Sequence, residues 1–299
     1  MAAIIPRDRL AKWAEALEAS GEYKVLRHLG KPKAIERAPQ ADERVAVIVD
    51  TETTGLDLQS DEVIELGMLA FTYSIDGRVE DIVDTFDELQ EPTRPLTTEI
   101  SAITGLTVND LRGNKINISN VEDFVSKADI IIAHNAAFDR PFCERISPVF
   151  KMKPWACSAT EIPWKLIGFG GVKLEYLLTQ CGYFYSAHRA LDDSFALFRV
   201  LSHSLTHGPS PFVQLLESAR KPTFRIRFSA PFEVRDRLRS KGYRWNAHPD
   251  PSKRHWYIDL SEDSVEDELG FVRSIKQIDP RSIVVDRFSA HTRFRLPDL

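Results

Sequence analysis

Two uninterrupted apolar runs constrain what this chain can fold into more than any other feature of its sequence. The first run, RVAVIVD, spans residues 44–50, and the second, ADIIIAH, spans residues 128–134. Both are short, rich in β-branched residues and without polar alternation, which is typical of strands buried on both faces of a sheet. Helix-like segments follow them, so we predict an α/β domain over residues 44–208.

The chain between the two runs predicts a β-hairpin. Residues 63–73 and 79–86 have strand-like composition, and the turn-forming dipeptide Asp76-Gly77 separates them. Asn135 follows the second run directly and predicts the cap of a helix. From their periodicity and end signals, the helices of this domain are expected over residues 117–127, 136–146, 173–180 and 190–205.

The segments on either side of this domain differ from it in composition. Before it, Leu10, Trp13 and Leu17 recur at helical spacing and a polar stretch follows, so residues 1–43 predict a helical segment and a linker. We expect this helix to pack on the α/β domain, and a docking element is the alternative. After it, residues 221–299 predict a small α+β domain, with strands and helices expected over residues 224–230, 231–240, 243–245, 255–260 and 262–275.

The net charge of −5 conceals an asymmetry along the chain. Residues 221–257 contain ten lysine and arginine residues and three acidic ones, so this segment carries +7 and the rest of the chain carries −12. A basic segment on an acidic chain favours a surface that binds anions. A solvated charged surface without a ligand is the alternative.

Composition argues against several classes of protein. Hydrophobic residues make up 43% and charged residues 28%, values that are ordinary for a globular protein and wrong for a disordered one. No apolar run approaches the ~18 residues that span a bilayer, and the N-terminal residues are too charged for a signal peptide. The three cysteines have no zinc-like spacing. We therefore expect a cytoplasmic protein without a membrane partner.

An Asp-x-Glu pair closes the first apolar run. Asp50 and Glu52 lie two residues apart, so their side chains share one face of an extended chain. Two carboxylates at the end of an apolar strand are costly unless a cation lies between them. The pair therefore indicates a divalent metal site, and a merely polar strand end is the alternative.

Three further candidates follow other elements of the domain. Asp139 lies in the first turn after the second run, at the same sheet edge, although a helix N-terminus favours an aspartate without any metal. On the helix expected over residues 190–205, Asp193 shares the apolar face, whereas Asp192 lies ~100° around the axis and is expected at the surface. His188 precedes this helix and is free to approach the same acids, with a purely structural histidine as the alternative.

Three motifs contain these residues: VIVDTETTGLD, AHNAAFDRPF and HRALDDSFALF. They resemble the three exonuclease motifs of the DEDDh family, whose best-known member is the epsilon proofreading subunit of bacterial DNA polymerase III. The resemblance covers about half of the chain, residues 44–205, and the histidine five residues before the last aspartate is typical of the DEDDh branch. The segment ITGLT (103–107) is similar to the family's loop between the hairpin and the first helix, with Thr104 in place of the histidine often found there.

The resemblance implies an RNase H-like fold, in which helices flank a mixed five-stranded sheet, and removal of nucleotides from a 3′ end. It implies a catalytic set of four metal ligands and one general base, namely Asp50, Glu52, Asp139, Asp193 and His188. Carboxylate ligands suit Mg²⁺, with Mn²⁺ as a plausible substitute, and two such ions neutralise the attacking and leaving oxygens of a phosphodiester. A histidine that titrates near neutral pH suits the removal of a proton from water.

By the same resemblance, a second set of residues would meet the terminal nucleotide. Thr53 and Thr54 follow the metal-ligand pair, and Leu56 would insert an apolar side chain between bases. Asn135 and Phe138 are further candidates for the nucleotide pocket, although a helix cap and a core contact explain these two residues equally well.

Residues 242–258 interleave aromatic and basic side chains. Aromatic rings stack on unpaired bases and basic groups hold phosphates, which favours binding of a single strand. The candidate contacts are Arg244, Trp245, Lys253, Arg254 and Trp256. The alternative is a small domain whose core requires both tryptophans.

We therefore expect a Mg²⁺-dependent 3′→5′ exonuclease that acts on single-stranded DNA, releases nucleoside 5′-monophosphates and carries an accessory nucleic-acid-binding domain. An RNA-trimming enzyme is the nearest alternative, because the five motif residues do not read the 2′-hydroxyl. A non-catalytic binding scaffold is disfavoured because all five residues are present. These patterns leave open the pathway, a polymerase or repair partner and the oligomeric state.

Overall fold

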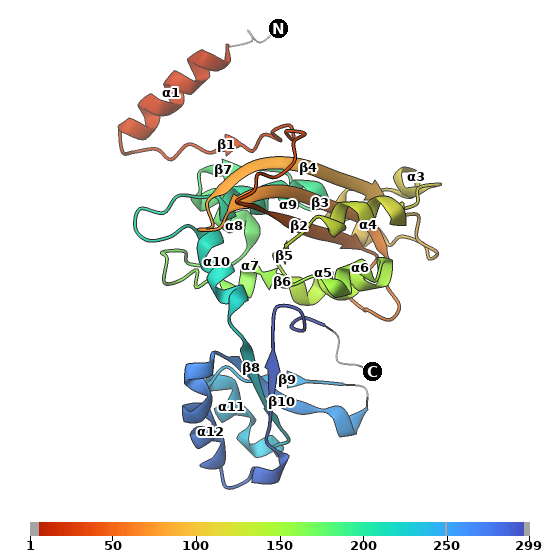
Figure 1. Ribbon diagram of the computed structural model, residues 1–299, viewed down its shortest axis with the longest axis vertical. Helices are drawn as coiled ribbons and strands as arrows, with labels where there is room; N and C mark the ends of the chain where they lie inside the picture. The colour runs from red at the N-terminus through yellow and green to blue at the C-terminus, as the bar shows by residue number, and fades with distance from the viewer. Residues whose placement is uncertain (1–5, 249, 296–299) are drawn as a thin grey trace.

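The computed structural model describes residues 6–248 and 250–295, which form three β-sheets, and the two larger sheets have separate hydrophobic cores (Figure 1). The first five residues of the predicted N-terminal segment, the last four of the predicted C-terminal domain and residue 249 lie outside this description. Across the described chain no helix is long and apolar enough to cross a membrane.

The larger sheet has five strands in the order β4-β3-β2-β5-β6. Its first three strands are antiparallel, whereas β5 and β6 run parallel to β2. Helices pack on both sides, so the expected mixed five-stranded sheet flanked by helices is confirmed. The strands are β2 (Glu43–Thr53), β3 (Val63–Ser74), β4 (Val79–Leu89), β5 (Ile130–Ala133) and β6 (Trp155–Cys157).

Strand alternation on β2 decides which helices each side chain meets. Ile48 packs into the core that contains the later helices, whereas Val47 and Val49 pack into the core that contains the earlier ones. The first apolar run is therefore buried on both faces, as predicted. One layer contains α8 (Leu174–Gln180), α9 (Ala190–Leu201) and α10 (Pro211–Arg220), and the other contains α4 (Ile118–Ser126), α5 (Ala136–Ile146) and α6 (Val149–Met152).

The segment that precedes α4 differs from its prediction. The loop expected at residues 103–107 overlaps α2 (Thr98–Thr104), and α3 (Val108–Leu111) follows it. Thr97 and Thr107 cap these helices with their hydroxyl groups, and Gly105 ends the first one in a left-handed conformation. Each helix is too short to show a clear apolar period, so hydrophobic periodicity in the sequence did not predict either of them.

The smaller sheet has four antiparallel strands in the order β11-β8-β10-β9. The small α+β domain expected in this part of the chain is confirmed, although β11 was not predicted, because its sequence VVDRF does not alternate strictly between apolar and polar residues. Its elements are β8 (Thr223–Phe228), η1 (Phe232–Val234), α11 (Arg235–Ser240), β9 (Arg244–Asn246), η2 (Pro251–Lys253), β10 (His255–Leu260), η3 (Glu262–Ser264), α12 (Val265–Arg273), η4 (Pro280–Ser282) and β11 (Val284–Phe288).

The chain after β11 returns to the larger sheet (Figure 1). The backbone N–H of Trp155 on β6 donates to the carbonyl of Ala290 at 2.8 Å. The guanidinium of Arg140 on α5, which is fully buried, donates to the carbonyls of Ala290, His291 and Arg293. Residues 289–295 thus pack on the domain that precedes the smaller sheet in sequence.

The N-terminal helix does not pack as expected. α1 (Arg7–Ala19) lies apart from the sheets in Figure 1, and Leu10, Trp13 and Leu17 are 41–49% exposed. After α1, β1 (Arg27–His28) pairs in parallel with β7 (Tyr183–Phe184). The apolar stripe of the helix therefore faces solvent. The first strand pairing with the rest of the protein is made by β1, after the helix has ended.

Candidate active site

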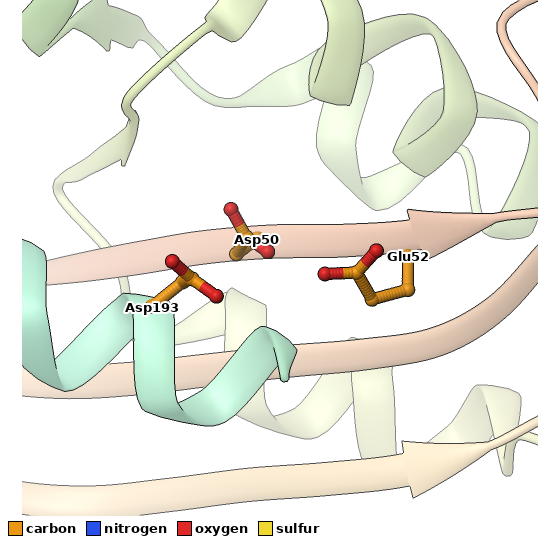
Figure 2. Close-up of side chains that lie close together, drawn as sticks. All are labelled: Asp50, Glu52 and Asp193. Carbon is orange, nitrogen blue, oxygen red and sulfur yellow. The ribbon is translucent and has the colours of Figure 1, made fainter. Parts of the chain in front are cut away.

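Strand alternation points two carboxylates of β2 toward α9. Asp50 and Glu52 continue the series that includes Ile48, whose side chain packs in the same core as α9. Asp193 lies in the first turn of α9 and meets them from the helix (Figure 2). One carboxylate oxygen from each of the three residues lies within 4.8 Å of the others. The tertiary fold thus gathers three of the four predicted metal ligands into one group.

The close approach of α9 depends on Gly67 of β3. A Cβ atom at this position would lie 2.2 Å from the backbone nitrogen of Leu191 and 2.3 Å from the carbonyl carbon of Ala190. Real Cβ contacts are essentially never that short, so only glycine admits the first turn of α9 at this distance. Because Asp193 lies in that turn, Gly67 sets how near its carboxylate comes to β2.

Two donors hold the carboxylate of Asp193 in place. The hydroxyl of Tyr185 donates to Oδ1, and the backbone N–H of His188 donates to Oδ2 at 2.8 Å. Both donors belong to the loop that leads into α9. Sequence reasoning missed Tyr185, and its position three residues before the start of the third motif was the available signal.

Asp139 reaches the same strand but does not join the group of three. It lies in the first turn of α5, and its Oδ1 accepts from the backbone N–H of Thr51 at 3.1 Å and from its hydroxyl at 2.9 Å. Thr51 alternates with Asp50, so these bonds hold Asp139 on the α5 side of β2. The charge of Asp139 nevertheless acts on Asp50 and helps raise its pKa.

Burial and mutual repulsion raise the pKa values of the carboxylates in this cluster. Burial, followed by the charges of Asp139 and Asp193, raises the pKa of Asp50 well above its usual range. Burial and the charge of Asp193 raise the pKa of Glu52 to about 8, and burial raises that of Asp139 to about 7. Carboxylates that are buried together destabilise one another unless a positive charge lies between them. An oxygen-only donor set with this excess negative charge fits divalent metal ions.

An ion pair between a buried glutamate and a partly exposed arginine borders the cluster and was not predicted. Glu65 of β3 is fully buried, pairs in register with Glu52 and forms an ion pair with Arg189 at 2.8 Å. The guanidinium of Arg189 lowers the pKa of Glu52, although the neighbouring acids outweigh it. A glutamate inside the apolar run VIELGML was the signal that sequence reasoning passed over.

His188 is exposed beside the cluster. Its φ of 68° is left-handed, a conformation that a residue other than glycine keeps only where surrounding contacts impose it. The hydrogen bond from its amide to Asp193 is such a contact. Burial raises the pKa of Asp193, and the hydrogen bonds and charge of neighbouring groups, His188 among them, oppose part of this rise.

Asp192 does not join the acidic group. Its side chain is 21% exposed and forms an ion pair with Lys31 of the linker, so it is less exposed than the surface position expected for it. Asp192 and Asp193 are adjacent on α9, so their side chains point in different directions and their carboxylates have different partners.

The loop after β2 contains the threonine and leucine candidates. The hydroxyl of Thr53, which is buried, donates to the carbonyl of Gly55 at 2.6 Å. The hydroxyl of Thr54 donates to Asp61 at 3.0 Å. Both hydroxyl groups thus stabilise the loop itself, whereas Leu56 is 84% exposed and free to meet a ligand.

The candidates at the start of α5 have different surroundings. Asn135 occupies the N-cap position and is exposed, but its side chain makes no capping hydrogen bond, so the predicted cap is wrong. Phe138 is half-buried, and its ring centroid lies 5.0 Å from that of Phe142 in the hydrophobic core. Within the described part of the chain, the amide of Asn135 thus has no capping partner, whereas Phe138 packs against the core.

The accessory contacts predicted in the smaller domain separate into two groups. Trp256 is 6% exposed in the hydrophobic core, and its ring lies 5.4 Å from that of Trp245, so a stacking role for Trp256 is wrong. Trp245 is 42% exposed at the edge strand β9. Arg244, Lys253 and Arg254 are exposed.

Comparisons with known proteins bear on residues 47–201, which match the family model RNase_T, described as exonuclease. The PolC-type DNA polymerase III of Thermotoga petrophila is 31% identical over 196 residues, which are 60% of this chain and 13% of that protein. The DNA polymerase III subunit epsilon of Treponema pallidum is 29% identical over 189 residues, 59% of this chain and 83% of that protein. A solved structure of exonuclease I has a TM-score of 0.47 and 16% identity, covering 83% of this chain and 63% of that one.

Proposed function

Because the chain belongs to the RNase_T exonuclease family, we propose that it removes nucleotides one at a time from the 3′ end of single-stranded DNA. The products are nucleoside 5′-monophosphates. The observation that carries this proposal is the convergence of Asp50, Glu52 and Asp193, whose carboxylate oxygens lie within 4.8 Å of one another.

The acidic group would hold two divalent ions, Mg²⁺ or Mn²⁺. Asp50, Glu52 and Asp193 would be ligands, and Asp139 would complete the set from the α5 side of β2. Such ions, when bound, stabilise negative charge on the reacting phosphate and lower the pKa of water.

The protein side chains around the acids have separate roles in this proposal. His188 would accept the proton of the attacking water, since its imidazole is exposed beside Asp193. Tyr185 and the amide of His188 would keep Asp193 oriented through the hydrogen bonds described above. The exposed Leu56 and Asn135 would contact the terminal nucleotide.

The relatives favour DNA over RNA as the substrate. Two of them are a PolC-type DNA polymerase III and an epsilon subunit of DNA polymerase III. The chain spans only about 13% of the PolC-type protein, so its partner is part of the proposal as well. We infer that this partner is a DNA polymerase or a DNA repair complex.

A side-by-side digestion tests the proposal. DNA and RNA oligonucleotides of one sequence, labelled at the 5′ end, are incubated with the protein in Mg²⁺ and in a chelator. We expect stepwise shortening of the DNA in Mg²⁺ only, and mononucleotide products. A circular single strand should stay intact, because it has no 3′ end. Cutting of the circle, or faster shortening of the RNA, would contradict the proposal.

A further inference from the structure

Helices cover one face of the smaller sheet. α11 and α12 pack against Ile226, Phe228 and Trp256, and together these residues form a separate core. Neighbouring residues on the same strands point the other way, because side chains alternate. We call that side the open face, and the strand register assigns to it Arg225, Arg227, Arg244, His255, Tyr257 and Phe288.

The open face brings guanidinium groups and aromatic rings into contact. The guanidinium carbon of Arg225 lies 4.4 Å from the ring centroid of Tyr257 and 5.2 Å from that of Phe288. Arg244 approaches the same tyrosine at 5.3 Å, and the ring of His255 lies 6.1 Å from it. These contacts join four strands into one layer of flat, polarisable groups.

Two aspartates hold the arginines of this layer. Asp259 accepts two hydrogen bonds from Arg225, at 2.6 and 2.9 Å, and lies 3.6 Å from Arg244. Asp286 accepts one from Arg227 at 2.6 Å. Three guanidinium groups against two carboxylates leave the face positive, and the side chains of Arg225, Arg227 and Arg244 stay 32–60% exposed. The arginines are therefore preorganised and still open to a ligand.

Flat cationic layers suit single-stranded nucleic acid. Unpaired bases stack on aromatic rings and on guanidinium planes, and exposed arginines hold phosphates. The excess of three guanidinium groups over two carboxylates on this face complements a polyanion. We propose that the open face binds single-stranded DNA, with bases stacked on Tyr257 and Phe288 and phosphates held by Arg244 and Arg227. This inference rests on the proposed function, because the bound strand is the one whose 3′ end the acidic site would trim.

Binding to oligothymidylate in a chelator tests the inference without hydrolysis. Fluorescence anisotropy gives the affinity of the full chain, its Tyr257→Leu variant and its Arg244→Ala variant over a series of salt concentrations. We expect Tyr257→Leu to weaken binding about 5- to 150-fold, as the loss of one stacked base does. We expect Arg244→Ala to reduce the slope of log K against log salt by about 0.7.

Two matched controls lie outside the open face. Phe232 is 72% exposed and has the guanidinium of Arg235 at 3.6 Å over its ring, so Phe232→Leu removes the same chemistry from the helical side of the domain. Arg281 is 91% exposed and pairs with Asp279, so Arg281→Ala removes an arginine elsewhere. Both variants should bind as the parent does.

The outcomes separate this inference from the proposed function. A Tyr257→Leu variant with the parental melting temperature and the parental affinity overturns the inference, and so does an equal loss in Phe232→Leu. Where Tyr257→Leu is destabilised, an unchanged affinity and salt slope in Arg244→Ala overturn it. Tighter binding of oligouridylate would overturn the assignment to DNA. Nucleotide release in Mg²⁺ is measured separately, so a protein that binds through Tyr257 but releases nothing contradicts only the proposed function.

Discussion

Asp192 and Asp193 are adjacent residues with opposite surroundings. The first forms an ion pair with Lys31, and the second is held by Tyr185 beside Asp50 and Glu52. We expect Asp193→Asn to lower metal-dependent nucleotide release by more than the ~10–100-fold that outer partners of a metal ligand cost. Asp192→Asn is the matched control and should retain activity. Equal losses in the two variants, measured as initial rates, would contradict the assignment.

The exposed imidazole of His188 makes a second prediction at this scale. Its proposed role is to accept a proton during the reaction, so His188→Ala should lower kcat by about 10²–10⁴-fold and leave KM nearly unchanged. The variant keeps the backbone N–H that donates to Asp193. An unchanged kcat at saturating DNA would assign the base to another group.

The raised pKa of Glu52 predicts how the metal-free protein responds to pH. Burial raises this pKa from 4.5 to about 8, so between these values the folded chain holds a proton that the unfolded chain has released. Stability of the metal-free protein should therefore fall as pH rises from about 4.5 to about 8. Melting temperatures in a chelator should show this fall, and Mg²⁺ should oppose it. Glu52→Gln should flatten the profile, and a profile that it leaves unchanged would exclude Glu52 as the cause.

At the scale of elements, the contact between β3 and α9 determines the geometry of the acids. A methyl group at Gly67 would lie 2.2–2.7 Å from backbone atoms of Ala190 and Leu191. Backbone atoms cannot move aside as the end of a flexible side chain can. We expect Gly67→Ala to destabilise the protein by about 1–3 kcal/mol. It should also reduce activity, because α9 carries Asp193.

Denaturant unfolding and initial rates measure both effects of the glycine substitution. Gly30→Ala is the control, because nothing lies within 4 Å of the added Cβ and the backbone there is not left-handed. If Gly67→Ala were as stable and active as Gly30→Ala, α9 would not depend on this close approach.

At the scale of the whole molecule, a tail formed by residues 289–295 packs on the exonuclease domain. The side chain of Arg293 is 6% exposed, forms an ion pair with Glu161 and donates to the carbonyls of Ala219 and Lys221. Removing one partner of a buried pair costs about 3–5 kcal/mol, because the other charge is left buried. We expect a loss of this size in the free energy of unfolding for Arg293→Met.

An exposed ion pair provides the control for the stability measurement on Arg293. Arg281 pairs with Asp279 at 2.9 Å and is 91% exposed, so Arg281→Met should change stability by less than about 0.5 kcal/mol. Equal effects of the two substitutions would show that the tail is only loosely attached.

The sequence alone determined the features that depend on local periodicity. Uninterrupted β-branched runs predicted the buried strands, and the two-residue spacing of Asp50 and Glu52 placed them on one face. The helical period identified Asp193, and not Asp192, as the candidate metal ligand on the apolar face of its helix. These inferences concern neighbours in the chain, where strand and helix geometry relates one residue to the next.

Only the tertiary structure decided contacts between distant segments. It placed Asp139 on the far side of β2, joined Tyr185 and Glu65 to the acidic site, and returned residues 289–295 to the first domain. It also buried Trp256 and left Tyr257 on the open face. The register between strands, and the approach of one element to another, depend on packing across long sequence separations. A local pattern carries no information about such packing.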